Sequence, residues 1–234
     1  MMATLLATPP TLPRLDKALE IPDFHKSRAL YNELLDGSNQ PPVADEHIMN
    51  LAEMFTRHNA HKVLGIHLIH GHFKIPHCKV MLRTNFENPS LRWTKVTDIE
   101  KVDPSNIHRH IFGLTKDGLC AYELQDGPLP HLSDVEPLFL DEFINYISKN
   151  NLASLIGLQG TVMLDSSYVK NTVPTRITGW RFETAHGNPR VCTANETHAQ
   201  MTSGNHKVFN AGKPLPKLES IEDLKAALAK AGVL

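Results

Sequence analysis

Between residues 62 and 124, apolar residues recur at every second position, and the segments with this period are separated by connections of only a few residues. Alternation of this kind is typical of β-strands. Connections this short join antiparallel neighbours, because a parallel pair needs a crossover of about a dozen residues or more. We therefore predict a series of antiparallel strands, at Val63–Ile75, Lys79–Phe86, Arg92–Ile99, His108–Leu114 and Leu119–Leu124.

Helical periodicity flanks these strands. Apolar residues at i, i+3, i+4 and i+7 from Ile48 to Phe55 predict a helix over Asp45–His58. We expect Pro22 to interrupt an earlier helical pattern, so that the better helix begins near Ser27. The other predicted elements are helices at Leu138–Lys149 and Leu218–Ala231 and strands at Gly160–Leu164 and Pro174–Glu183.

Helices before and after a run of strands indicate an α+β fold. We predict a mainly antiparallel sheet that is curved into a half-barrel or barrel-like shape, with the helices on its flanks. The Pro-rich residues 1–14 form a flexible N-terminal tail in this prediction. Residues 15–234 form a single α+β domain.

The charge balance argues against two classes of partner. The chain has 24 Lys and Arg residues against 25 Asp and Glu residues, which supplies no general attraction to nucleic acid or to an anionic membrane. No apolar stretch reaches the roughly 18 residues of a transmembrane helix. Residues 1–11 lack a basic leading segment, and the three cysteines are widely spaced. We therefore expect a cytoplasmic protein with reduced thiols, whose oligomeric state the sequence leaves open.

Histidine is unusually frequent, with 14 residues, and the first candidate site lies in the histidine-rich segment 61–77. If this segment continues as one strand, the apolar residues from Leu64 to Leu68 share a face with His70 and His72. Two ligands separated by one residue are able to bind the same ion, and neutral imidazole suits Zn, Fe and Cu. His70 and His72 are therefore candidate metal ligands, or acid–base groups in catalysis.

A second pair, His108 and His110, also shares a strand face. If this strand neighbours the first, side chains opposite one another lie about 5 Å apart, and all four imidazoles converge on one divalent transition metal. The alternative is that these histidines are structural or surface residues. One sequence does not decide between the two, because a slip of one residue in register turns every side chain to the other face.

Three further residues have a candidate role. Glu196 and His198, in the polar segment near the C-terminus, are candidate catalytic acid–base groups above a pocket, because loops on a rigid scaffold often carry function. A solvated loop is the alternative. Arg83 has the geometry to bind a substrate carboxylate, but we expect it at an exposed strand position.

These observations favour a small enzyme that acts on a small organic molecule, with strand-borne histidines as metal ligands or acid–base groups. An isomerase, a lyase or cyclase, and a metal-dependent oxidoreductase all fit. The alternative is a non-catalytic module that binds a small molecule or a protein and in which the histidines are structural. No G-x-S-x-G, P-loop, G-x-G-x-x-G or H-E-x-x-H pattern is present.

Overall fold

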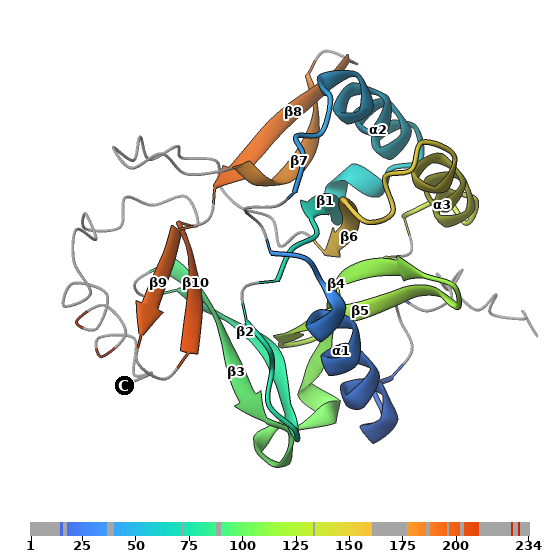
Figure 1. The fold of residues 1–234 in the computed structure, drawn as a ribbon. Helices are drawn as coiled ribbons and strands as arrows, with labels where there is room; N and C mark the ends of the chain where they lie inside the picture. The colour runs from blue at the N-terminus through green and yellow to red at the C-terminus, as the bar shows by residue number, and fades with distance from the viewer. Residues whose placement is uncertain are drawn as a thin grey trace, which may run out of the picture.

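Three α-helices and one sheet make up the part of the chain that the structure describes, which confirms the α+β class (Figure 1). This computed structural model describes residues 15, 18–36, 40–71, 73–87, 90–132, 134–160, 177–185, 188–195, 197–201 and 204–210, together with Ala226 and Ala229. For the described residues that fall between 85 and 93 and between 177 and 210, it describes the backbone alone. Among the described helices, none is both long and apolar enough to span a membrane.

The predictions for two of the helices are confirmed within one residue at each end. α2 begins at Asp45, and its predicted stripe from Ile48 to Phe55 is buried. α3 buries Phe139, Phe143 and Ile147 against α2. The helices are α1 (Ile21–Glu33), α2 (Asp45–Arg57) and α3 (Phe139–Lys149), with short 3₁₀ helices η2 (Ala60–Lys62), η3 (Ile99–Lys101) and η4 (Pro104–Asn106).

The predicted interruption at Pro22 is wrong, because Pro22 lies in the first turn of α1. At that position a backbone N–H has no partner within the helix, so proline costs nothing there. Glu20 and Asp23 form a reciprocal capping box that fixes this start. A single helix therefore runs through Ser27, where the sequence predicted a new beginning.

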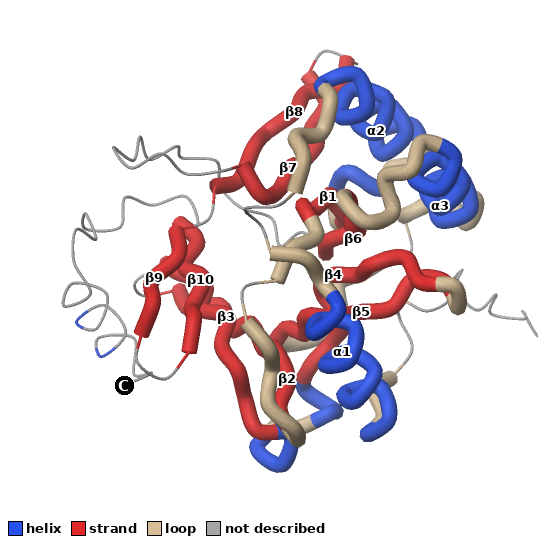
Figure 2. The backbone as a smooth tube through the Cα atoms, viewed as in Figure 1, coloured by secondary structure: helices blue, strands red, loops and turns tan. Residues whose placement is uncertain are grey.

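The strands agree with most of the sequence predictions. One strand lies at Ile156–Gly160, and of the strand predicted at Gly160–Leu164 only Gly160 belongs to the described residues. The polar segment after Ala185, where loops were expected, carries three described strands (Figure 2). The strands are β1 (Leu64–Leu68), β2 (Lys79–Glu87), β3 (Ser90–Asp98), β4 (Ile107–Thr115), β5 (Gly118–Asp126), β6 (Ile156–Gly160), β7 (Ile177–Ala185), β8 (Asn188–Asn195), β9 (Thr197–Met201) and β10 (Gly204–Asn210).

Within the described ranges, the strands form one sheet in the order β8-β7-β1-β6-β4-β5-β2-β3-β10-β9. All neighbours are antiparallel except β2 and β5, which are parallel through Leu82↔Leu124 and Arg83↔Gln125. The six contiguous strands β1–β6 are neither closed nor strongly curled. The predicted half-barrel or barrel-like shape is therefore wrong. Closure requires the two outermost strands to pair with a fixed stagger, whereas β8 and β9 each have a described partner on one side only.

The central strands separate two clusters of apolar side chains. Alternation places Leu64 and Ile66 of β1 on one face, where they join the large core formed with α2 and α3. Met81 of β2 lies on the other face, in a smaller cluster with Tyr31 of α1 and Tyr122 of β5. This second face also carries buried polar side chains, and it is the face on which the candidate site lies.

The long strand predicted at Val63–Ile75 is wrong, because β1 ends at Leu68. Pairing with β6 stops there, and Ile69 donates the last backbone hydrogen bond on this side, to the carbonyl of Leu155. The chain then turns to the end of α1, where the Gly71 amide donates to the Leu35 carbonyl at 2.8 Å. Strand alternation therefore does not determine the direction of the His70 side chain, because residue 70 lies beyond the end of β1.

β6 and β4 approach closely at Gly157. A Cβ atom added to Gly157 would lie 2.4 Å from the carbonyl oxygen of Phe112 and 3.1 Å from Ile69 Cγ1. The first contact is to backbone, so a side chain there forces the two strands apart.

We predict that Gly157→Ala lowers the free energy of unfolding by about 1–3 kcal/mol, the range typical of overpacking. Urea denaturation measures this difference. Gly113→Ala is the matched control, because its added Cβ would meet only side-chain atoms at 3.7–3.8 Å. Equal effects of the two substitutions would contradict the close approach at Gly157.

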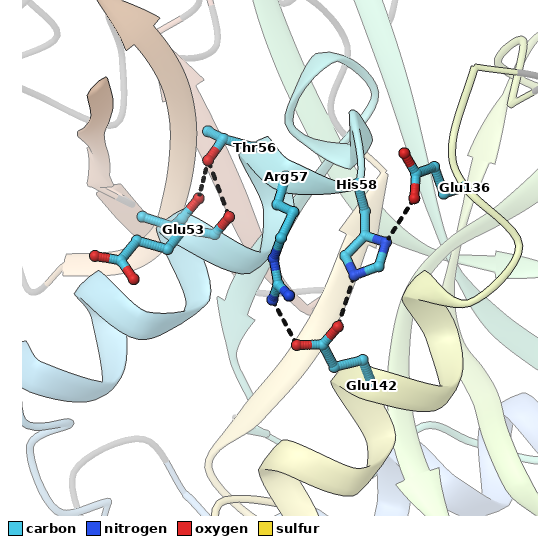
Figure 3. A network of polar contacts seen from close by, with 7 residues as sticks. Glu53, Thr56, Arg57, His58, Glu136 and Glu142 are labelled. Carbon is cyan, nitrogen blue, oxygen red and sulfur yellow. Dashed lines mark hydrogen bonds and ion pairs between the residues drawn. The ribbon is translucent and has the colours of Figure 1, made fainter. Parts of the chain in front are cut away.

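A polar network ties the end of α2 to the first turn of α3 (Figure 3). His58 is buried, and its two ring nitrogens face carboxylate oxygens, with Nε2 2.7 Å from Glu142 Oε2 and Nδ1 3.3 Å from Glu136 Oε2. Arg57 Nη2 lies 2.5 Å from the other oxygen of Glu142. The hydrogen bond from His58, followed by that from Arg57, lowers the pKa of Glu142 below its usual range.

Because the pKa of Glu142 is lower in the folded chain, its contribution to stability is present above about pH 4.3 and is lost as the pH falls through the folded pKa. The side chain of Glu142 is 39% exposed, so solvent screening limits the loss in Glu142→Gln to about 1 kcal/mol or less. Thermal unfolding between acidic and neutral pH measures it. Asp141→Asn is the control, because it removes a negative charge from the same first turn of α3. It should lower stability less than Glu142→Gln. An equal loss would show that the effect comes from the helix dipole and not from the contacts with His58 and Arg57.

Several predictions concern residues outside the described ranges. They include the N-terminal tail at residues 1–14 and most of the predicted C-terminal helix, of which only Ala226 and Ala229 are described, both helical. The single domain over residues 15–234 stays a prediction.

Candidate functional site

Six buried polar residues lie together on the sheet, on the strands β2, β3, β4 and β5. Strand alternation and the registers place Arg83, Thr94 and Gln125 on the face opposite the large core, and His108 is paired with Gln125 across β4 and β5. We call them the buried polar cluster, with the half-buried Gln159 of β6 at its margin. Its members are Arg83, Thr94, His108, His110, Glu123 and Gln125.

Arg83 is the largest of these side chains and is fully buried. It lies on β2 between Thr94 of β3 and Gln125 of β5, its backbone partners on either side. Its guanidinium reaches past β5 to β4, where Nη1 donates to His110 Nε2, and its Nε lies 3.4 Å from Thr94 Oγ1. A guanidinium only donates hydrogen bonds, so every group bound to it must be an acceptor.

His110 meets that requirement in one tautomer. Its Nε2 accepts from Arg83 and lies 3.3 Å from the amide nitrogen of Gln159, so the ring carries its proton on Nδ1. The pairing of β4 with β5 shifts register on both sides of Ile111. Such irregularities re-aim side chains, and here the ring of His110 reaches Arg83. Gly160 leaves room for this ring, since a Cβ there would lie 3.3 Å from His110 Nδ1.

His108 is held by a backbone carbonyl. Its Nδ1 donates to the carbonyl of Gly127 at 2.9 Å, which places the lone pair on Nε2. Burial lowers the pKa of His108 below its usual range, although the Gly127 hydrogen bond and the charge of Asp126 act in the opposite direction. The ring is therefore neutral at physiological pH and has a defined tautomer.

Two acceptors of the cluster have no hydrogen-bond partner in the described structure: Nε2 of His108 and Oε1 of Gln125. The two residues are direct partners across β4 and β5, so their Cβ atoms lie about 5 Å apart. Their exposed fractions are 6% and 3%. Buried acceptors are rarely left without a donor, so this pair indicates a place for a donor group.

We predict that His108 titrates below about pH 6.5, the ordinary value for histidine. NMR observation of its ring protons across the pH range measures this. The unfolded chain binds the proton first, so His108 costs stability as the pH falls from about 6.5 to its folded pKa. Asp126→Asn should lower the pKa of His108 further, and a midpoint at or above 6.5 would contradict the dominance of burial.

His70 lies just beyond β1 and is buried. Its Nδ1 donates to the carbonyl of Leu68 at 2.5 Å. Its ring stacks on His67 with 5.4 Å between centroids, although strict alternation predicted the two rings on opposite faces. The end of the strand at Leu68 explains this difference.

Four converging imidazoles required the strand of His108 and His110 to neighbour the strand that leads to His70. The two strands are not neighbours, because β6 lies between β1 and β4 in the sheet. The registers of β6 with its two neighbours place His110 level with Leu64, at the start of β1, whereas His70 follows the end of β1. The lone pair of His110 Nε2 is already directed at Arg83. Within the residues that the structure describes, no three His, Cys, Asp or Glu side chains are grouped so as to hold a metal ion.

The remaining candidates stay predictions. His72 and Glu196 lie outside the described residues, so a Zn, Fe or Cu site at His70 and His72 is not tested. His198 lies on β9 opposite Lys207 of β10, where the backbone alone is described.

Sequence reasoning misplaced Arg83 and did not single out Thr94, Glu123 or Gln125. The expectation that Arg83 is exposed is wrong, since its exposed fraction is 0%. Gln125 lies one residue beyond the strand end predicted at Leu124, whereas β5 continues to Asp126. The alternation within one strand does not show which of its polar side chains become buried, because that depends on the neighbouring strands.

Comparisons of the chain with protein-family models, with curated proteins and with solved structures find no match. The chemistry of the cluster follows from its geometry alone. It combines a neutral imidazole of defined tautomer with a permanent cation at Arg83 and a carboxyl group at Glu123, all removed from bulk water. Groups of this kind bind a small polar molecule and transfer a proton.

Proposed function

We propose that the protein is an enzyme that acts on a small organic molecule by acid–base chemistry, with its site at the buried polar cluster and His108 as the base. One observation carries the proposal: Nε2 of His108 is buried, holds a lone pair and has no hydrogen-bond partner in the described structure. A general base needs an available lone pair within reach of the proton that it removes.

The surroundings of His108 support this role. The carbonyl of Gly127 fixes the tautomer, as the oriented partner of a catalytic histidine does. The lowered pKa keeps the ring in its basic form at physiological pH. After proton transfer, the charge of Asp126 would stabilise the imidazolium of His108.

The second candidate is a non-catalytic binding module, and His70 favours it. That interpretation expects histidines bonded to backbone carbonyls, and His70 Nδ1 makes such a bond to Leu68. We accordingly propose a structural role for His70. The two candidates differ in whether a bound molecule is converted.

A screen of small organic molecules by thermal shift tests the proposal, with His108→Asn as the variant. Asparagine retains a donor in place of Nδ1 and removes Nε2. We expect molecules that stabilise the wild type and not the variant, and we expect the wild type to convert at least one of them. General-base catalysis supplies about 10²–10⁴-fold, so conversion, followed by NMR of the molecule, should fall by about 100-fold or more.

His25→Asn is the matched control, because His25 is exposed on α1 and the substitution is the same. It should leave binding and conversion unchanged. Binding without conversion would support the non-catalytic module. Molecules that bind His108→Asn as well as the wild type would contradict a site at the buried polar cluster.

A further inference from the structure

We infer that the group bound beside His108 is an uncharged hydrogen-bond donor, an amide N–H or an alcohol O–H, and not a carboxylate, a phosphate or a cation. The inference rests on the proposed function, since it names the class of molecule that the same site takes. It starts from the two opposed acceptors, His108 Nε2 and Gln125 Oε1.

The requirement for a donor follows from His108 and Gln125 together. In the orientation that the structure gives, Gln125 presents its amide oxygen, and Nε2 of a neutral His108 with its proton on Nδ1 also accepts, so neither group satisfies the other. A buried acceptor without a donor destabilises the fold, so a ligand that donates is favoured over one that only accepts. A carboxylate or a dianionic phosphate has no donor.

The conclusion that the ligand group is uncharged follows from the nature of the two acceptors and from the charged residues around them. A neutral imidazole and an amide carry no formal charge with which to offset the lost hydration of an ion. Arg83 and Glu123, the two ionisable residues of the cluster besides its histidines, have opposite formal charges and are both fully buried. Asp126 already accepts a hydrogen bond from Thr84. A neutral donor therefore satisfies the two acceptors at the smallest cost of desolvation.

The rest of such a molecule has room on the side of Gly127. A Cβ placed on Gly127 would meet no atom within 4 Å, and this glycine supplies the carbonyl that holds His108. Gly127 follows the end of β5 and is half-buried.

Acetamide, acetate and acetamidinium test the inference, because they share one planar shape and differ in charge and donors. With histidine labelled by ¹⁵N, the resonance of His108 Nε2 is followed as each probe is added at constant ionic strength, and His108→Asn assigns it. We expect acetamide to shift this resonance and to saturate it. Acetate has no donor and should bind about tenfold more weakly or not at all, the effect of roughly one net hydrogen bond. Acetamidinium keeps its donors but loses the hydration of its charge, so it should also bind more weakly than acetamide.

Two variants sharpen the test. Gln125→Glu keeps the shape of the side chain and adds a negative charge, so preference should move from acetamide to acetamidinium. Gln125→Leu removes the second acceptor and should weaken acetamide about tenfold, with circular dichroism to verify folding. Equal or stronger binding of acetate, or no response of His108 to acetamide, overturns the inference.

The two proposals fail in different ways. If a screened molecule is converted through His108 while acetamide leaves the resonance unchanged, the proposed function stands and the ligand class is wrong. If acetamide reaches His108 but no screened molecule depends on this residue, the ligand class stands and the enzymatic role is wrong.

Discussion

The burial of Arg83 is the constraint on which the rest of the site depends. A guanidinium keeps its charge at physiological pH and only donates hydrogen bonds, so removing it from water is tolerated only where acceptors surround it. His110 Nε2 and Thr94 Oγ1 are two of these acceptors. The hydrogen bond from Arg83 determines the tautomer of His110. The ring of His110 reaches Arg83 where the pairing of β4 with β5 is irregular beside Ile111.

Backbone carbonyls orient the other two histidines of interest in the same way. His70 donates to Leu68 and His108 to Gly127, and each then has its lone pair on Nε2. Identical local chemistry leads to different proposals because the surroundings differ. His70 stacks on another imidazole, whereas His108 lies opposite Gln125, whose amide oxygen also needs a donor.

Features with a local cause could be predicted from the sequence, and features with a distant cause could not. The stripe from Ile48 to Phe55 repeats within a few turns, so α2 was predicted almost to the residue. The end of β1 depends instead on the contact of Gly71 with the end of α1. Arg83 becomes buried through the pairing of β2 with β5, whose partner residues lie 42 positions further along the chain. His108 was a candidate, but its partner Gln125 follows from register.

The parallel pairing of β2 with β5 has a consequence for the order in which the chain folds. The β2–β3 and β4–β5 hairpins close between residues only three positions apart in the sequence, and hairpins form in about microseconds. Joining β2 to β5 brings two completed hairpins together, at a larger cost in loop entropy. Because Arg83 and Gln125 become partners only in that step, the site is assembled late, after the local strands exist.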